Sequence, residues 1–377
     1  MTDQTSLYQQ LREHFDTLPI GMPATKSGTE IEILKELFTP EEAEIVLQLS
    51  ILPESVKRVH KRLTHLSISR EDLDMKLHDM KTRGLIIGDQ RRGRNRYSRV
   101  QLAIGMFEFQ VDRLTKNFME QLHRYEDEAF GEELHRTGVP QMRPVPINES
   151  IESLNEIATY DMIREYVKKS PGPFAVVNCV CRQGMDIVEN PCRQTDLRET
   201  CLMIGSTVEL YVHTLGSGRE VEQDEFLEIL TSCEKAGLVI QPGNSLNPSF
   251  ICCCCSCCCG ILTTLKKLPR PAEATTSNYF AEVDHQACTS CAACIDTCPM
   301  EALSIEDDFA EVDRYRCIGC GICTVECPTG ALVLKKKVKE VKPPASQTRM
   351  YMKVLVRRLG IKNLIKTGIS YIFGKKV

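Results

Sequence analysis

The first third of the chain alternates apolar and polar residues at helical spacing. The stretch "TPEEAEIVLQLS" begins with Thr39 as a predicted N-cap, and Pro40 and Glu42 complete the capping-box signature of a helix start. Two more helical stretches, "PESVKRVHKRLT" and "SREDLDMKLHDMKTRG", precede "LIIGDQRRGRNRYSRVQL", which predicts a hairpin with a basic tip. A longer helix is expected to follow, over about residues 103–130.

Three helices followed by a hairpin form the pattern of a winged-helix domain, which we predict over residues 1–135. Winged helices often bind DNA, and the arginines of the hairpin suit phosphate contacts. They are Arg91, Arg92, Arg94 and Arg96. The segment that would enter a DNA groove, residues 69–83, has four acidic and four basic side chains, unlike a groove-inserting surface. We therefore expect this domain to dock or pack against protein, and we expect no nucleic-acid partner.

The middle of the chain mixes strand and helix patterns. The apolar run "PFAVVN" at residues 173–178 predicts a strand, whereas "LMIGSTVELYVHTLG" at residues 202–216 and "ILTTLKKL" at residues 261–268 predict helices. The fold class expected from the whole chain is therefore α+β.

Proline-punctuated segments at residues 136–147 and 268–278 are interpreted as linkers. They divide the chain into the N-terminal domain, a mixed cysteine-rich domain over residues 148–267 and a third domain over residues 279–334, followed by a basic tail over residues 345–377.

The tail predicts an amphipathic helix with Lys362 and Lys366 at the border of its apolar face. That face consists of Ile361, Leu364, Ile365, Ile369 and Ile372. Such a helix could lie on an anionic membrane surface or pack against protein. Residues 281–333 have ten acidic and two basic side chains, whereas residues 335–377 have thirteen basic side chains and one acidic. This contrast favours protein contact, with peripheral membrane contact as the alternative.

Composition places the chain among ordinary soluble proteins, because 42% of its 377 residues are hydrophobic and 26% are charged. The polar N-terminal stretch has no secretory signal, and no apolar run reaches the roughly 18 residues that span a membrane. We therefore expect a cytoplasmic protein. In a reducing compartment, its 20 cysteines indicate metal or redox chemistry in preference to disulfides.

Eight of these cysteines belong to a repeat. "EVDHQACTSCAACIDTCPMEAL" aligns with "EVDRYRCIGCGICTVECPTGAL" at a constant offset of 29 residues, and both stretches read C-x2-C-x2-C-x3-C-P. Small residues inside the loops allow the backbone to approach a cluster closely, so that amides can donate hydrogen bonds to sulfur. They are Ala292, Ala293, Gly319 and Gly321.

This repeat closely resembles the bacterial two-cluster ferredoxins, which implies two [4Fe-4S] clusters. In that family the fourth cysteine of each run ligates the other cluster. The implied ligands are Cys288, Cys291, Cys294 and Cys327 for the first cluster, and Cys317, Cys320, Cys323 and Cys298 for the second. The alternative is a pair of four-cysteine zinc sites. The complete spacing with its terminal proline in both copies favours clusters, and the surrounding acidic residues predict low reduction potentials.

A second set of cysteines lies upstream. The candidate ligands are Cys179, Cys181, Cys192, Cys201, Cys252, Cys254, Cys255, Cys257, Cys258 and Cys259. Cys179 and Cys181 would share one face of an extended chain, and nearby arginines would favour their thiolate forms. We expect at least one additional Fe–S cluster here. A zinc site and simple burial of small apolar residues are the alternatives, and burial is the expectation for Cys233.

The whole arrangement resembles a family of prokaryotic 4Fe-4S ferredoxin proteins, which have a helical N-terminal region, a segment like "NCVCR" with later cysteines, a segment like "ICxCCxCCCG" and a dicluster module. In that pattern the position of Cys253 is not always cysteine, so we do not expect Cys253 to be a ligand.

We interpret the protein as a one-electron carrier between redox protein partners, without substrate turnover of its own. The alternatives are a redox-sensing DNA-binding regulator and the electron-transfer subunit of a larger oxidoreductase complex.

Overall fold

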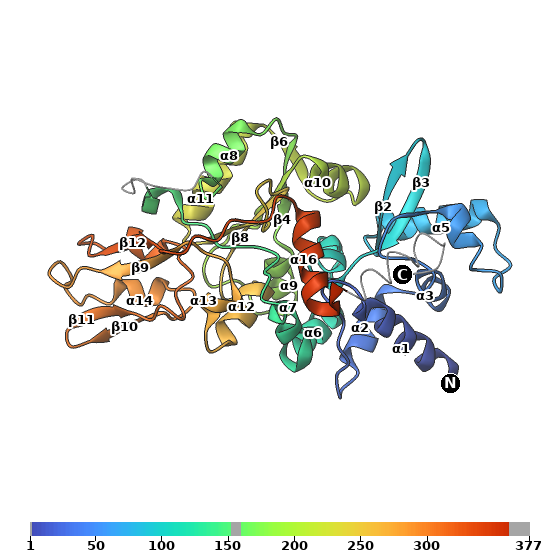
Figure 1. Ribbon diagram of the computed structural model, residues 1–377, viewed down its shortest axis with the longest axis horizontal. Helices are drawn as coiled ribbons and strands as arrows, with labels where there is room; N and C mark the ends of the chain where they lie inside the picture. Colours follow the sequence, from blue (N-terminus) through green and yellow to red (C-terminus); the bar gives the residue numbers. More distant parts are fainter. Residues whose placement is uncertain (1, 152–159, 362–377) are drawn as a thin grey trace. The chain divides into compact units, whose positions relative to one another are not determined.

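The computed structural model describes residues 2–151 and 160–361 and has a mixed α+β fold (Figure 1). The chain divides into two compact units. One contains Met1–Thr137, His213–Ser217 and Tyr351–Val377, and the other contains Gly138–Val212 and Gly218–Met350. The predicted ferredoxin region belongs to the second unit, as does the predicted cysteine-rich region apart from His213–Ser217, and the finer boundary between the two regions stays a prediction. Within the described residues, no helix is both long and apolar enough to cross a membrane.

The first unit begins with helices that bury one face each. They are α1 (Thr2–Asp16), α2 (Thr29–Leu37), α3 (Pro40–Val46), α4 (Val56–His60) and α5 (Arg70–Thr82). The predicted capping box at α3 is confirmed, because Thr39 N donates to Glu42 Oε2 at 2.8 Å and Glu42 N donates to Thr39 Oγ1 at 3.3 Å. Ser69 caps α5 in a similar way, by accepting a hydrogen bond from Asp72 N.

The predicted hairpin is also present. Strands β2 (Ile86–Arg91) and β3 (Arg94–Arg99) pair antiparallel, and the short β1 (Glu54–Ser55) adds to β3. Arg92 and Gly93 both have positive φ, as a two-residue hairpin turn of type I′ requires.

The helix expected over residues 103–130 is wrong in its first part. Ala103 and Ile104 have extended dihedral angles, and Asp112 has a φ of 65°. The helix begins only at Lys116, where Thr115 accepts a hydrogen bond from Phe118 N and satisfies one of the free amides of the first turn. From there α6 (Lys116–Tyr125), a π-helical turn (Glu126–Phe130) and α7 (Gly131–His135) continue one another.

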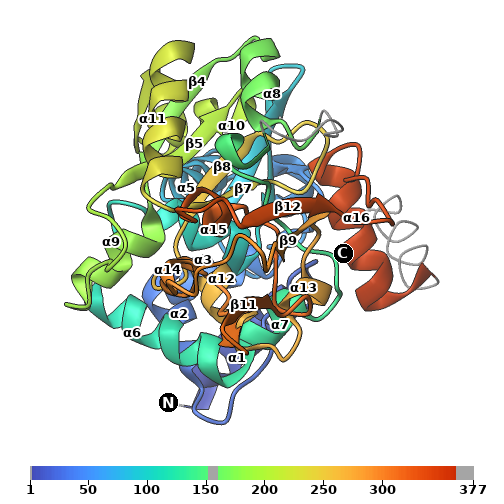
Figure 2. The same ribbon diagram turned by 90° about the vertical axis from the view of Figure 1, so that its left-hand side faces the viewer.

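An antiparallel five-stranded sheet organises the second unit, in the order β6-β4-β5-β8-β7. Its strands are β4 (Phe174–Asn178), β5 (Glu199–Ile204), β6 (Arg219–Val221), β7 (Val239–Pro242) and β8 (Phe250–Cys254). Helix α11 (Gln223–Lys235) packs on the sheet and buries Phe226, Leu230 and Cys233 (Figure 2). The remaining helices are α8 (Ile163–Lys169), α9 (Val180–Ile187) and α12 (Gly260–Lys267).

The strand predicted at residues 173–178 is confirmed as β4, but the helix predicted at residues 202–216 is wrong at its start. Leu202–Ile204 complete the central strand β5, which pairs with β4 on one side and β8 on the other. Gly205, with a φ of 67°, ends the strand. Helical turns follow it in α10 (Ser206–Val208) and the π-helical Glu209–Thr214. Backbone pairing at the centre of the sheet therefore overrides the helical spacing of the apolar residues.

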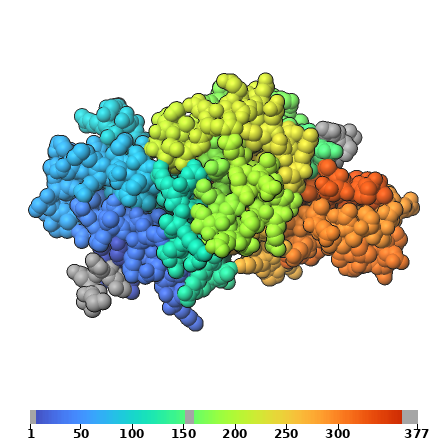
Figure 3. Space-filling model, turned by 180° about the vertical axis from the view of Figure 1, so that it is seen from behind, coloured from blue at the N-terminus to red at the C-terminus, as the bar shows by residue number. Residues whose placement is uncertain are grey.

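The cysteine repeat folds as two copies of one strand–helix–strand pattern. The first copy consists of β9 (Tyr279–Val283), α14 (Ala293–Thr297) and β10 (Leu303–Glu306), and the second of β11 (Phe309–Val312), α15 (Ile322–Val325) and β12 (Leu332–Lys336). The short helix α13 (Pro271–Ala274) precedes them. Strand β9 pairs with β12, and β10 pairs with β11, so each two-stranded sheet contains one strand from each copy. Figure 3 shows this segment in orange against the green and yellow surface of the same unit.

Helix α16 (Gln347–Leu359) follows the repeat. Ile361 is exposed, whereas the other residues of the predicted amphipathic face, together with Lys362 and Lys366, lie outside the described residues. The membrane and protein-docking alternatives for the tail both stay predictions.

The proline-punctuated segment before residue 148 packs closely on the second unit. Val145 N donates to Ile240 O at 3.0 Å, and the Arg143 side chain is buried in an ion pair with Asp161. Asn278 Nδ2 donates to the other carboxylate oxygen of Asp161 at 3.2 Å. Burial raises the pKa of Asp161, although Arg143 opposes this effect. This ion pair therefore links three separate stretches of the chain.

We predict that Arg143→Met lowers the free energy of unfolding of the second unit by about 3–5 kcal/mol, because it leaves the Asp161 carboxylate buried without its cation. The loss should shrink at acidic pH, where protonation of Asp161 removes the uncompensated charge. Denaturant unfolding followed by circular dichroism at two pH values would measure both effects. The control is Lys168→Met, which removes an exposed ion pair with Glu165 and should leave the unfolding midpoint unchanged. Equal losses in the two variants would contradict the role given to the buried pair.

Candidate metal centres

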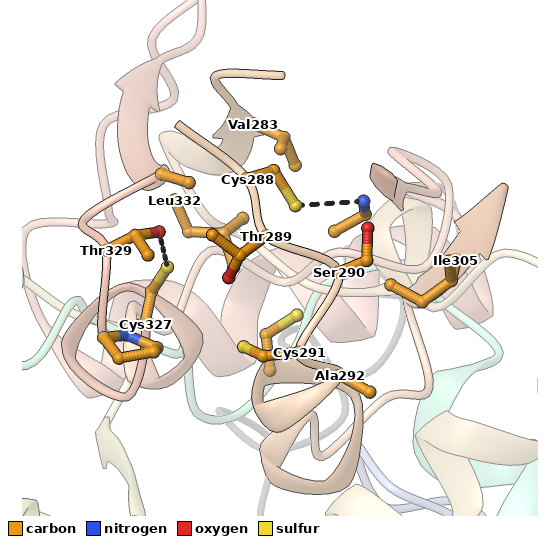
Figure 4. A pocket seen from close by; sticks show the side chains of 14 residues that line it. Val283, Cys288, Thr289, Ser290, Cys291, Ala292, Ile305, Cys327, Thr329 and Leu332 are labelled. Carbon is orange, nitrogen blue, oxygen red and sulfur yellow. Dashed lines mark hydrogen bonds between the residues drawn. The ribbon is translucent and has the colours of Figure 1, made fainter. Parts of the chain in front are cut away.

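Four cysteines surround a cavity at one end of the cysteine repeat. The four that line it are Cys288, Cys291, Cys294 and Cys327. Figure 4 shows the thiols of Cys288, Cys291 and Cys327 around this space, with Thr329 beside Cys327. Cys291 is exposed, so this centre lies at the protein surface.

The other four cysteines of the repeat surround a second, small cavity. Cys298, Cys317, Cys320 and Cys323 line it together with Met300 and Ile318. Three of these cysteines are buried, so the second centre is more enclosed than the first. The structure thus brings the eight cysteines together in the two sets predicted for swapped ligation, while their role as ligands stays a prediction.

Backbone amides of each copy point to sulfurs of the other. Ala281 N donates to Cys317 Sγ at 3.4 Å, and Ala310 N donates to Cys288 Sγ at 3.4 Å. Both donors and both acceptors are related by the offset of 29 residues. Such N–H···S bonds stabilise electron density on a cluster sulfur, so the residues present fit a bound Fe–S cluster.

The loops need left-handed backbone at equivalent positions. Ser290 and Gly319 have φ values of 53° and 67°, and Ala292 and Gly321 have values of 61° and 80°. At Gly319 a Cβ atom would lie 2.3 Å from the Tyr279 carbonyl oxygen, so only glycine fits there. The tight second loop therefore depends on its glycines more than the first loop does.

The ten upstream cysteines form two groups, which the sequence did not separate. The first, which we call the compact group, consists of Cys192, Cys255, Cys257 and Cys258. Its four sulfurs all lie within 4.8 Å of one another, and this is the only such set of potential metal ligands among the described residues. Cys192 Sγ lies 3.6 Å from Cys255 Sγ and 3.7 Å from Cys257 Sγ, and Cys257 Sγ lies 3.6 Å from Cys258 Sγ.

The second set, which we call the thiol ring, has six members. They are Cys179, Cys181, Cys259, Cys254, Cys252 and Cys201, and in this order each thiol interacts with the next, while Cys201 closes the ring on Cys179. Sheet register builds one side of the ring, because Cys201 on β5 is paired with Cys252 on β8. Cys252 and Cys254 lie two residues apart on β8, so both thiols face the ring.

Cys179 and Cys181 contribute to the ring in a way that differs from expectation. The extended Cys-x-Cys arrangement is wrong, because Cys179 is the N-cap of α9 and Cys181 lies in its first turn. Cys259 is likewise the N-cap of α12. Both helices therefore present their N-termini to the ring. The positive end of a helix dipole favours a nearby thiol in its thiolate form.

Two cysteines lie apart from both groups. Cys253 and Cys233 are buried, and their thiols interact with each other between β8 and α11. Because Cys253 alternates with Cys252 and Cys254, its side chain is on the opposite face of the strand.

A buried arginine lies between the compact group and the thiol ring. Arg182 is fully buried, and its guanidinium donates to Thr200 Oγ1 at 2.6 Å and to Cys253 O at 3.1 Å. Burial by itself lowers the pKa of Arg182, but thiolates of both groups, Cys179 and Cys255 foremost, outweigh burial and raise it. The neighbouring thiol of Cys258 and the charge of Arg182 lower the pKa of Cys255 to about 5, against the effect of burial. Arg182 is therefore a fully buried positive charge placed among many thiols.

Comparison with known proteins supports the iron–sulfur assignment for one stretch. Residues 309–332 match the family model of a 4Fe-4S binding domain, which includes Cys317, Cys320, Cys323 and Cys327. Neither a curated protein nor a solved structure matches the chain. A 4Fe-4S binding domain and the clustered cysteines support at least one Fe–S cluster and a role in electron transfer or redox chemistry.

We predict that Gly319→Ala disrupts the second cavity and removes up to about four irons per chain, the content of one cubane. The added Cβ would clash with the Tyr279 carbonyl and would also strain the backbone. Gly330→Ala is the matched control, because Gly330 has nearly the same φ but no atom within 4 Å of the added Cβ. Iron analysis and thermal unfolding under anaerobic conditions would compare the variants. Similar iron loss in both would show that backbone strain, and not the clash, is decisive.

Proposed function

We propose that the protein transfers single electrons between redox partners through two [4Fe-4S] clusters in residues 279–334 and a further cluster in the thiol ring. The observation that carries this proposal is the pair of four-cysteine cavities with exchanged N–H···S bonds. A bound [4Fe-4S] cluster supplies reversible one-electron exchange. The chain supplies the thiolate ligands, the hydrogen bonds to sulfur and the exclusion of water.

The difference in exposure supports a direction for the path. Exposed Cys291 places the first centre where an external partner can approach. The second centre lies against the five-stranded part of the unit, since Ile147 N donates to Cys320 O at 3.1 Å and a Cβ on Gly321 would contact Ser150. The redox partner therefore docks at the first centre, and the second centre passes electrons between the first centre and the interior of the unit.

Helix α12 supports a connection to the thiol ring. It begins at Cys259, a member of the ring, and its last turn accepts a hydrogen bond from the ferredoxin segment, because Arg316 Nη2 donates to Lys266 O at 3.0 Å. An eight-residue helix is about 12 Å long, so the ring and the second centre are separated by little more than this helix.

The thiol ring suits a cluster better than a single ion. Its six thiols are spread more widely than those of the compact group, and a cluster binds each thiolate at a separate iron. Six candidates exceed the four ligands of one cubane, so the ring has two spare thiols or holds a larger cluster.

We further propose that the first unit is a winged-helix domain that docks a protein partner. The order of α3, α4 and α5 followed by the β2–β3 hairpin supports the assignment. DNA binding is less favoured, because Arg96 is held in an ion pair with Asp89, and Arg83 in ion pairs with Asp79 and Glu42. If the protein is instead the electron-transfer subunit of a larger oxidoreductase, the first unit would dock another subunit of that complex.

The first test of this function is the metal content of anaerobically purified protein. We expect about twelve irons per chain with matching acid-labile sulfide, from three cubanes, and paramagnetic signals that appear on reduction and vanish on reoxidation. Cys252→Ser, in the ring, should lower the iron content without removing the signals of the ferredoxin segment. Eight irons would refute the ring cluster alone, and protein without reducible iron would refute the whole proposal.

The second test concerns swapped ligation. Cys298→Ala should abolish the same cluster as Cys317→Ala, so the double variant should lose no more iron than either single variant. Cys298→Ala combined with Cys288→Ala should instead remove both ferredoxin clusters. Iron content and the EPR spectrum of the reduced protein would distinguish the pairs. If Cys298→Ala were additive with Cys317→Ala and not with Cys288→Ala, each run of cysteines would bind its own cluster.

A further inference from the structure

The compact group has the dimensions of a site for one metal ion. Zn–S bonds of about 2.3 Å place the four sulfurs of a tetrahedral site about 3.8 Å apart. Three sulfur pairs of the compact group lie at 3.6–3.7 Å, and all four sulfurs lie within 4.8 Å of one another. The thiolates of a cubane each bind a different iron and need a wider spacing. The compact group is therefore too tight for a cubane.

We propose that Cys192, Cys255, Cys257 and Cys258 bind a single Zn²⁺ ion. This site is separate from the electron-transfer path proposed above, and either assignment can fail without the other. Zn²⁺ takes four thiolates in a tetrahedral arrangement without redox change, and its d electrons impose no further geometric preference, which suits ligands from one loop and one tight turn.

The position of Arg182 supports a negatively charged centre here. A four-thiolate Zn²⁺ site has a net charge of −2, and a charge of this kind is stable inside a protein only beside a compensating cation. Arg182 is fully buried, its Nε has no hydrogen-bond partner in the described part of the chain, and thiols of the compact group lie close to its charge. The single positive charge of Arg182 therefore offsets half of the net charge of −2 of the proposed site.

The ion would hold two stretches together. Cys192 lies in the loop between α9 and β5, which is largely exposed, whereas Cys255, Cys257 and Cys258 lie in the turn between β8 and α12. The protein contacts of this loop include the Arg198–Asp186 ion pair and a hydrogen bond from Gln194 to Ala236 O at 3.1 Å. The Zn²⁺ ion would thus fasten the loop to the turn that also carries the ligand Cys259 of the ring.

The test is zinc and iron analysis of the full chain purified anaerobically from medium that contains both metals. We expect one zinc per chain. Cys257→Ser should lower the zinc content at least tenfold and leave the iron content and the EPR spectrum unchanged, and trypsin should then cleave faster after Arg193 and Arg198. Cys233→Ser, which changes a buried thiol outside both groups, is the control and should retain zinc.

Rescue by a second ligand type keeps the test independent of misfolding. Cys192→His should retain zinc, because a neutral imidazole is an ordinary zinc ligand, whereas Cys192→Ala should lose it. Protein in which Zn²⁺ is replaced by Co²⁺ should show the visible absorption of a tetrahedral cobalt–thiolate site, and Cys257→Ser should abolish it. Loss of iron in Cys257→Ser, iron in place of zinc at this site, or wild-type protein without zinc would each overturn the proposal.

Discussion

Repulsion between thiolates is the constraint on which the second unit depends. Many thiols are gathered within a small buried volume, and low dielectric surroundings make every uncompensated negative charge there costly. Without metal, burial and a neighbouring thiolate together raise the pKa of a thiol, as at Cys257, where burial has the larger effect and Cys255 adds to it. Arg182 offsets part of this charge, and the metals proposed above would offset the rest. The sheet, the helix N-termini and the buried arginine therefore suit a protein whose folding is completed by metal binding.

The exchange of parts between the two copies of the repeat is the second organising feature. Each two-stranded sheet combines one strand from each copy, and each cavity takes its fourth cysteine from the other copy. Neither copy can build a complete centre by itself. The two cavities therefore depend on each other, because a change in the first loop also alters the lining of the cavity built mainly by the second.

The repeat could be predicted from the sequence because its signal is local, since spacing, proline and loop glycines all lie within a few residues of the cysteines. The division of the upstream thiols into two groups could not be predicted from the sequence. It depends on the register that pairs Cys201 with Cys252 and on a turn between β8 and α12. Similar reasons explain the two helix errors. Leu202–Ile204 form a strand because they pair with strands on both sides. Helix α6 starts later than predicted because Asp112 has a positive φ and Thr115 caps the helix. Alternation along β8, by contrast, was a usable signal, because it separates Cys253 from Cys252 and Cys254.

The order of the ligands along the chain bears on how the protein is made. All cysteines of the thiol ring and the compact group precede Gly260, and the strands that hold them, β4 to β8, are complete before that point. The first cysteine of the repeat, Cys288, is synthesised later. A nascent chain emerging from the ribosome therefore exposes the upstream cysteines before those of the repeat, so metals could be acquired in two successive steps along one polypeptide.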